Sequence, residues 1–269
     1  MTHKQQWEEP HDTLRKTQSP TCSIETPAPS GYFPPAMNLI PQRVRDAFGR
    51  TLDPLAQVLI RVHVRPNVIT TLGTLVVVAS AAAFALGAVR WGGFLLLFSG
   101  VFDMVDGRVA RQGSMVTTFG AFYDSTLDRV GESVLFGGIA TYFLRGGVAA
   151  NRLTPAVLAC FVALAASLLV SYTRARAEGL GLTAKVGIAQ RAERVLLLGA
   201  PTMFFGAGNH GVLFFWIVVI LALATSVTVV QRVIYVARAA GEPAGRRVPP
   251  LRRDTLPGHA PALQSRKGP

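Results

Sequence analysis

The feature that most constrains the fold is a series of long apolar segments. A bilayer core about 30 Å thick requires about 20 predominantly apolar residues for each helical crossing. Six segments meet or approach this length, at residues 67–89, 91–110, 118–144, 154–177, 194–206 and 211–235. Charged residues make up only 16% of the chain, compared with about 25% in typical soluble domains. The sequence therefore predicts an all-α integral membrane protein with six transmembrane helices.

The segments that flank these six have a different composition. Residues 41–64 mix apolar side chains with several arginines, which predicts a basic amphipathic helix lying at the membrane surface. Pro54 argues against one unbroken helix there. Residues 1–38 and 240–269 are rich in proline and in polar or basic residues, so both are predicted to be disordered tails. Residues 39–239 then form a single membrane domain.

The distribution of basic residues predicts the orientation of the helices. The chain has 27 Lys and Arg against 15 Asp and Glu. If both termini are cytoplasmic, the outer face receives only Arg90, Arg145 and Arg152, as expected when basic residues are retained inside. We therefore expect a multi-pass protein of the cytoplasmic membrane with both termini inside. Arginines at membrane ends can bind anionic lipid headgroups and give no reason to expect a nucleic-acid partner.

Acidic residues within the apolar region are concentrated in one short stretch. A carboxylate at membrane depth costs about 2.5–3.5 kcal/mol, so such residues face each other, water or a cation. Asp103 and Asp106 are three residues apart, and Asp124 and Asp128 are four apart, so each pair lies on one helix face. A short link at residues 112–117 predicts that the two helices are antiparallel neighbours. Four carboxylates on facing helices predict a site for a hard divalent cation, Mg²⁺ or Mn²⁺.

Three alternatives explain the same carboxylates differently. They could form salt bridges with Arg108, Arg111 and Arg129. They could line the ion path of a cation transporter, although the acids cluster at one end of the helices and no pair of broken helices is evident. A prenyltransferase also uses metal-binding aspartates, but its acidic motifs are expected on separate helices.

The stretch from Asp103 to Asp128 resembles the signature of the CDP-alcohol phosphotransferase family, D-x2-D-G-x2-A-R-x8-G-x3-D-x3-D, and fills every fixed position. The six-span layout with a surface helix is also similar, so the resemblance covers about residues 41–238. Members of this family transfer a substituted phosphate from a CDP-linked donor, usually CDP-diacylglycerol, to an alcohol and release CMP. The resemblance thus implies a membrane-bound phosphatidyltransferase, and it also implies a homodimer.

The resemblance implies roles for individual residues. Asp103, Asp106 and Asp124 become ligands of two divalent ions, and Asp128 becomes the general base that also touches the second ion. The residues implied to line the CDP-donor site are Gly107, Ala110, Arg111 and Gly120, with Asn67 and Thr70 at its border. For Asn67 and Thr70, helix capping is the alternative interpretation.

Three polar segments in the second half of the chain resemble the corresponding segments of phosphatidylinositol-phosphate synthases of actinobacteria and of related archaeal ether-lipid enzymes. They are residues 171–178 (SYTRARAE), 190–194 (QRAER) and 231–232 (QR). The similarity implies that the phosphate of inositol 1-phosphate is held by Ser171, Arg174, Arg191 and Arg232. Arg174 stands where Lys is usual, and Ala192 where Pro is usual. Two alternatives remain: the arginines could only orient the helices, or the acceptor could be glycerol 3-phosphate, which gives phosphatidylglycerophosphate.

Overall fold

The computed structural model describes residues 42–182, 184 and 186–241. The predicted tails lie outside these residues, apart from residues 240 and 241. The described part is helical and contains no strand. Its helices are α1 (Gln42–Arg61), α2 (Pro66–Ala85), α3 (Val89–Gln112), α4 (Thr118–Tyr142), α5 (Ala150–Gly179), α6 (Arg191–Phe205) and α7 (Val212–Gly241). A short π-helical turn, η1 (Phe143–Gly147), and a 3₁₀ turn, η2 (Asn209–Gly211), precede α5 and α7.

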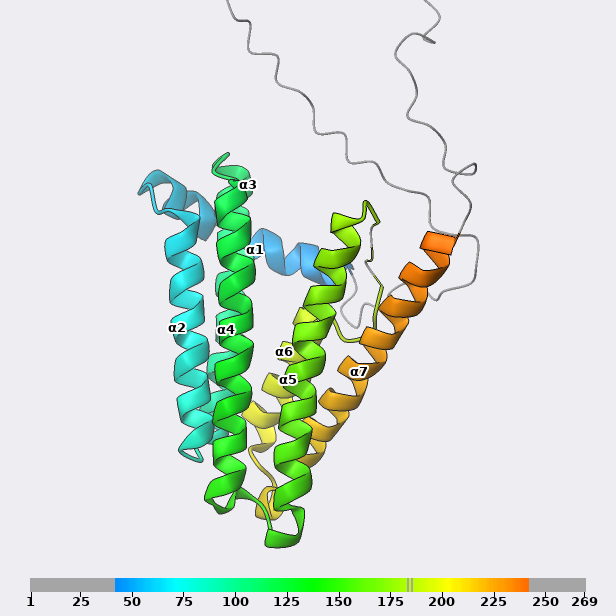
Figure 1. Cartoon of the computed structure of the whole chain (residues 1–269). Helices are drawn as coiled ribbons and strands as arrows, with labels where there is room; N and C mark the ends of the chain where they lie inside the picture. Colours follow the sequence, from blue (N-terminus) through cyan, green and yellow to red (C-terminus); the bar gives the residue numbers. More distant parts are fainter. Residues whose placement is uncertain (1–41, 183, 185, 242–269) are drawn as a thin grey trace, which may run out of the picture.

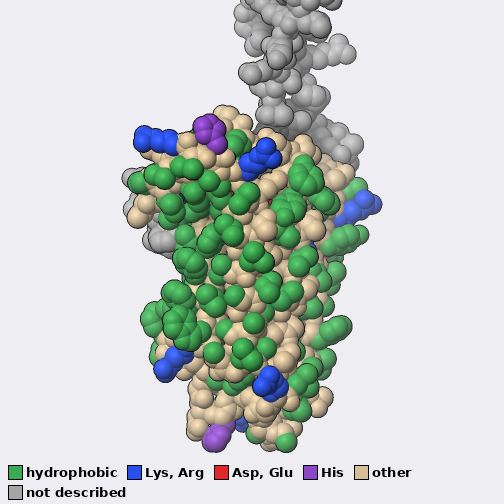
Figure 2. All heavy atoms as spheres, turned by 90° about the vertical axis from the view of Figure 1, so that its left-hand side faces the viewer, with side chains coloured by type: hydrophobic (Ala, Val, Ile, Leu, Met, Phe, Trp, Pro, Cys, Tyr) green, Lys and Arg blue, Asp and Glu red, His purple; other side chains and the backbone are tan. Residues whose placement is uncertain are grey.

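The surface has the character of a membrane protein. Among the described residues, α2, α5 and the segment 209–240 are long and apolar enough to cross a bilayer. Figure 2 shows hydrophobic side chains over the middle of the molecule, with Lys, Arg and His gathered toward its two ends. On α2 the exposed side chains include Val68, Leu72 and Leu75. A broad apolar surface of this kind is stable against lipid and costly against water, so the protein is embedded in a membrane.

Each of the six predicted apolar segments coincides with one helix, with ends that differ by a few residues. The prediction that Pro54 interrupts the first helix is wrong, since α1 runs through it. Proline removes one backbone donor and costs about 3 kcal/mol inside a helix. The apolar side of α1 offsets this cost by packing Ala56 against Ile69, Val105 and Val109 of α2 and α3.

The helices form two packed groups (Figure 1). In one group α2 packs against both α3 and α4, and in the other α5 packs against α7, while α6 contacts both α3 and α7. Within the described chain, α3 and α4 have few close backbone contacts with each other, and both pack on α2. The aspartate-bearing parts of α3 and α4 leave room for the side chain of Arg191, which contacts Asp103 of α3 and Asp128 of α4.

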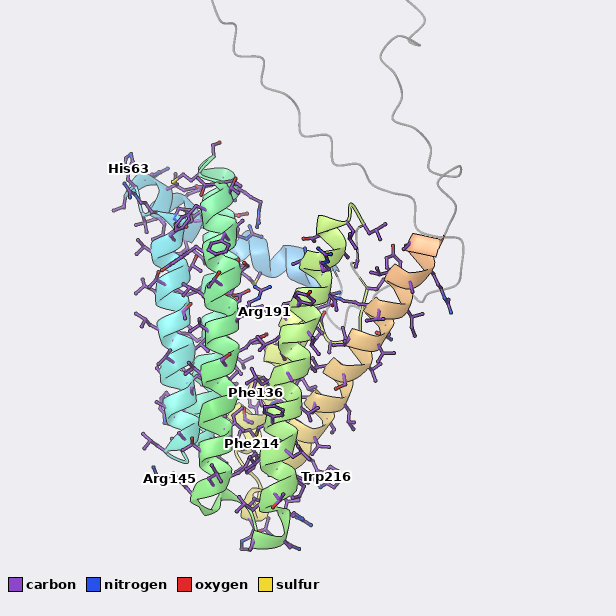
Figure 3. All side chains as sticks on the ribbon, in the orientation of Figure 1. His63, Phe136, Arg145, Arg191, Phe214 and Trp216 are labelled. Carbon is purple, nitrogen blue, oxygen red and sulfur yellow. The ribbon has the colours of Figure 1, made fainter. Side chains whose placement is uncertain are left out.

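The apolar core and the polar region occupy opposite ends of the bundle. Phe84, Phe143 and Phe214 are fully buried, and the rings of Phe84 and Phe214 stack with centroids 5.2 Å apart. Figure 3 shows Phe136 and Phe214 in the lower half of the bundle and Arg191 in the upper half. Apolar side chains fill the lower half, so the polar side chains of the upper half determine what the molecule can bind.

The first helix is attached to the polar end of α3. Figure 1 shows α1 lying crosswise at the upper end of the bundle. Asp53 of α1 forms an ion pair with Arg108 and accepts a hydrogen bond from Nε2 of Gln112 at 2.8 Å. These contacts fix the last turns of α3, immediately beyond Asp106.

Candidate active site

The two aspartate pairs lie on either side of the turn that joins α3 to α4. Asp103 and Asp106 belong to α3, and Asp124 and Asp128 belong to α4. At the start of α4, Oγ1 of Thr117 accepts a hydrogen bond from the backbone N–H of Gly120 at 2.9 Å, which caps the helix. One guanidinium, that of Arg191, contacts both Asp103 and Asp128, and Asp106 and Asp124 line one cavity. The structure therefore gathers the predicted carboxylates into one acidic cluster.

A cavity on one side of the cluster contains all six predicted donor-site residues. Its lining includes Asn67, Thr70, Gly107, Ala110, Arg111 and Gly120, together with Asp106 and Asp124. Oγ1 of Thr70 donates a hydrogen bond to Oδ2 of Asp106 at 2.8 Å, and Asp106 is almost completely buried. The capping interpretation is wrong, because Arg65 occupies the N-cap of α2 and makes no side-chain cap bond.

The small size of Gly120 keeps this cavity open. A Cβ atom at this position would lie 2.9 Å from Oγ1 of Thr117 and 3.3 Å from Oδ1 of Asn67. Both distances are shorter than ordinary van der Waals contact, so a larger residue would displace the cap or the Asn67 side chain. The position thus allows a ligand to approach the helix backbone closely.

A second cavity lies between α4, α5, α6 and α7. Its lining includes all four predicted acceptor-site residues, Ser171, Arg174, Arg191 and Arg232. Asp124 and Asp128 also line it, and Asp124 lines both cavities. The acidic cluster therefore separates a cavity rich in small residues from a cavity rich in arginine.

The three arginines predicted to bind the acceptor have different surroundings in the second cavity. Arg232 is buried, and its guanidinium donates hydrogen bonds to the carbonyl oxygens of Val186, at 2.9 Å, and Val170. It thereby holds the segment between α5 and α6 in place. Arg174 is exposed and pairs with Glu178 of its own helix, with Nε 2.9 Å from Oε1.

Arg191 is the arginine that contacts the acidic cluster. Its Nη2 atom lies 2.9 Å from Oδ2 of Asp103, and its Nη1 atom forms an ion pair with Oδ1 of Asp128. Figure 3 shows it between the two groups of helices, in the upper half of the bundle. One guanidinium thus bridges a carboxylate of α3 and a carboxylate of α4.

The predicted salt-bridge alternative named the wrong arginines. Arg108 pairs with Asp53, and Arg129 donates to the backbone oxygen of Ser125. Within the described residues, neither these two arginines nor Arg111 forms an ion pair with the four aspartates. The arginine that does so lies more than sixty residues beyond the motif, where no local spacing indicates the contact.

Sequence reasoning missed an ion pair and a hydroxyl that fix the start of α6. Arg194 pairs with Glu132 of α4 and also donates to the carbonyl oxygen of Ala189 at 3.2 Å. Oγ1 of Thr228 accepts a hydrogen bond from the backbone N–H of Ala189 at 3.0 Å. One signal was available, since Glu132 follows Asp128 by one helical turn and therefore shares its face.

The ligand atoms that the cluster offers suit a hard divalent cation, because all four side chains provide carboxylate oxygens. In the part of the chain that the structure describes, no three His, Cys, Asp or Glu side chains are arranged as a ligand group. In the structure Arg191 contacts Asp103 and Asp128, and Thr70 donates a hydrogen bond to Asp106. Four carboxylates against one guanidinium leave an excess of negative charge, which a divalent cation would neutralise.

Comparison with known proteins identifies the class to which this fold and site belong. The family model described as CDP-alcohol phosphatidyltransferase matches residues 63–230, which include the acidic cluster and the lining of both cavities except Arg232. The chain belongs to the CDP-alcohol phosphatidyltransferase family and is a phosphatidyltransferase enzyme.

Individual relatives point to one branch of this family. The chain is 37% identical over 206 residues to the phosphatidylinositol phosphate synthase of Cutibacterium acnes, covering 74% of this chain and 98% of the relative. It is 38% identical over 192 residues to the archaetidylinositol phosphate synthase of Methanothermobacter thermautotrophicus, covering 71% and 91% respectively.

Solved structures give the same result. The structure of the Mycobacterium tuberculosis phosphatidylinositol phosphate synthase with CDP-DAG bound matches with a TM-score of 0.61 and 34% identity, over 70% of this chain and 94% of that one. The same enzyme in complex with manganese and citrate matches with a TM-score of 0.60, over 68% and 88%.

Proposed function

We propose that this enzyme transfers the phosphatidyl group of CDP-diacylglycerol to inositol 1-phosphate and releases CMP. The observation that carries the proposal is the acidic cluster shared by two cavities, one lined by small residues and one lined by arginines. The first suits a nucleotide that lies close to helix backbones, and the second suits a phosphorylated alcohol. The relatives named as phosphatidylinositol phosphate synthases support this choice of acceptor.

The residues in and around the acidic cluster would have different roles in this reaction. Asp103, Asp106, Asp124 and Asp128 would hold two Mg²⁺ or Mn²⁺ ions, whose positive charge would neutralise the pyrophosphate and stabilise the leaving CMP. Asp128 faces the arginine-lined cavity and takes the proton from the attacking hydroxyl as general base. Asn67, Thr70, Gly107, Ala110, Arg111 and Gly120 bind the CDP moiety. Holding both substrates against one cluster lowers the entropic cost of bringing them together.

The acceptor is tested by a screen with purified enzyme in detergent. Inositol 1-phosphate, glycerol 3-phosphate, free inositol and serine are each supplied with CDP-diacylglycerol, and CMP release and product mass are measured. We expect inositol 1-phosphate to be the best substrate. A preference for glycerol 3-phosphate would reassign the acceptor within the same chemistry, whereas a preference for free inositol or serine would contradict a phosphate-binding cavity.

We further propose six membrane spans, with residues 39–239 as the membrane domain and α1 at the cytoplasmic surface. The apolar segments of α3, α4 and α6 support the count, although α3 and α4 carry the aspartates and α6 is short. Figure 3 shows Arg145 at the end of the bundle opposite His63. The distribution of basic residues supports cytoplasmic termini, and family membership supports a homodimer. Labelling of cysteines introduced at each end in intact cells would test the orientation.

Replacing Thr70 by Val is expected to weaken transfer by about tenfold. Valine keeps the shape of the side chain but removes the hydroxyl that donates to buried Asp106, and a hydrogen bond to a charged group contributes about 1.5–3 kcal/mol. The measurement is kcat/KM for CDP-diacylglycerol. Thr70→Ser retains the hydroxyl and serves as the matched control. Equal losses in both variants would indicate packing as the cause instead of the hydrogen bond.

Replacing Arg174 by Gln is expected to raise the KM for inositol 1-phosphate about tenfold or more, because a charge-assisted contact contributes about 1.5–3 kcal/mol. The KM for CDP-diacylglycerol should stay nearly unchanged. Arg176 lies on the same helix but outside the cavity lining, so Arg176→Gln removes the same charge and should leave both KM values near wild type. If the two variants raise the acceptor KM equally, Arg174 acts only through the long-range electrostatic effect of its positive charge and not through direct contact with the acceptor.

A further inference from the structure

The contacts of the four aspartates divide them into two unlike pairs. Asp103 and Asp128 share the guanidinium of Arg191. Among the described residues, Asp106 and Asp124 have no ion pair, and both line the donor cavity. Among the described residues, the protein therefore supplies one positive charge directly to Asp103 and Asp128 and none to Asp106 and Asp124.

The backbone that carries Arg191 is firmly held, while its side chain reaches across a cavity. Arg194 anchors the first turn of α6 through Glu132 and Ala189, and Thr228 anchors the preceding segment. The side chain of Arg191 is 33% exposed and lines the acceptor cavity. Rotation of this long side chain can thus move its guanidinium from the carboxylates into the cavity without moving the helix.

A guanidinium and a divalent cation compete for the same oxygens. Both are positive, so they repel each other strongly in a partly buried site where the effective dielectric constant is low. A cation that takes up Asp103 and Asp128 removes the partners that hold Arg191 in place. The released guanidinium presents a planar fork of donors suited to phosphate oxygens.

We propose that Arg191 is an internal counter-cation that a divalent ion must displace from Asp103 and Asp128, and that its displacement supplies the acceptor cavity with a phosphate-binding guanidinium. The acceptor half of this inference rests on the proposed function. Metal binding and acceptor binding are then coupled, and the coupling is reciprocal. The enzyme then forms its complete acceptor site only after a divalent cation has bound to Asp103 and Asp128.

The first test measures Mn²⁺ binding by electron paramagnetic resonance on the purified protein in detergent, with neither substrate present. Arg191→Gln removes the competing cation and should bind Mn²⁺ at least about tenfold more tightly, since the metal no longer has to break a charge-assisted hydrogen bond, which corresponds to about tenfold or more in affinity. Arg129→Gln is the matched control, because Arg129 lines the same cavity but donates to the backbone oxygen of Ser125. It should change Mn²⁺ affinity much less.

Arg191→Lys separates displacement from the effect of net charge. Lysine keeps the charge but lacks the fork that bridges two carboxylates at once, so this variant should also bind Mn²⁺ more tightly than wild type. Equal or weaker Mn²⁺ binding by Arg191→Gln, or an increase of the same size in Arg129→Gln, would overturn the inference. Thermal melting of each variant verifies that it is folded.

The second test measures the coupling. Inositol 1-phosphate should raise the Mn²⁺ affinity of the wild-type protein and should have little effect on that of Arg191→Gln. No effect on the wild type, or an equal effect on both, would overturn the acceptor half. Since Mn²⁺ binding without substrates does not depend on transfer, failure of the proposed function would appear in the acceptor screen and leave the first test intact.

Discussion

Asn in place of Asp103 or Asp124 is expected to reduce CMP release about a hundredfold to a thousandfold, since removal of one group that stabilises transition-state charge costs about 10²–10³ in rate. Both residues belong to the acidic cluster, and Asp124 lines both cavities. The amide keeps the size of the side chain but offers a weaker, neutral ligand to a divalent cation. CMP release from CDP-diacylglycerol at saturating Mg²⁺ or Mn²⁺ measures the effect.

Asp53→Asn provides the matched control for these two variants. It makes the same chemical change on a carboxylate that joins α1 to α3, outside both cavities. We expect this variant to lose some thermal stability and to keep turnover within a few-fold of wild type. Turnover within a few-fold of wild type in Asp103→Asn or Asp124→Asn would contradict the metal assignment.

Asp128→Asn is expected to abolish transfer while CDP-diacylglycerol still binds. A positioned general base contributes about 10²–10⁴ to the rate, and an amide cannot accept the proton of the attacking hydroxyl. The donor cavity does not include Asp128 in its lining, so donor affinity should change little. Donor binding by calorimetry and CMP release are measured on the same preparation.

The metal requirement distinguishes the two roles assigned to Asp128. If Asp128→Asn turns over at the normal rate and only needs a higher metal concentration, the residue is a ligand and not the base. Arg191 contacts Asp128, so the double variant Asp128→Asn with Arg191→Gln shows whether the released guanidinium contributes to the loss. A base role predicts that the double variant remains inactive.

Local sequence patterns determined the helices and the membership of the site. The lengths of the apolar segments predicted where six helices lie, because a helix needs about 20 mostly apolar residues to cross the bilayer core. The spacing of Asp103, Asp106, Asp124 and Asp128 predicted two carboxylate pairs on two helix faces. The family signature predicted six donor-site residues, and all six line one cavity of the structure.

The tertiary structure decided the contacts between segments that are distant in the chain. The packing of both α3 and α4 on α2, the continuity of α1 through Pro54 and the attachment of α1 through Asp53 all depend on packing that no local period encodes. The same holds for Arg191. Its position at the start of α6 is visible in the sequence, but its choice of Asp103 and Asp128 over the solvent follows from the way α6 is anchored beside α4, where buried opposite charges attract strongly.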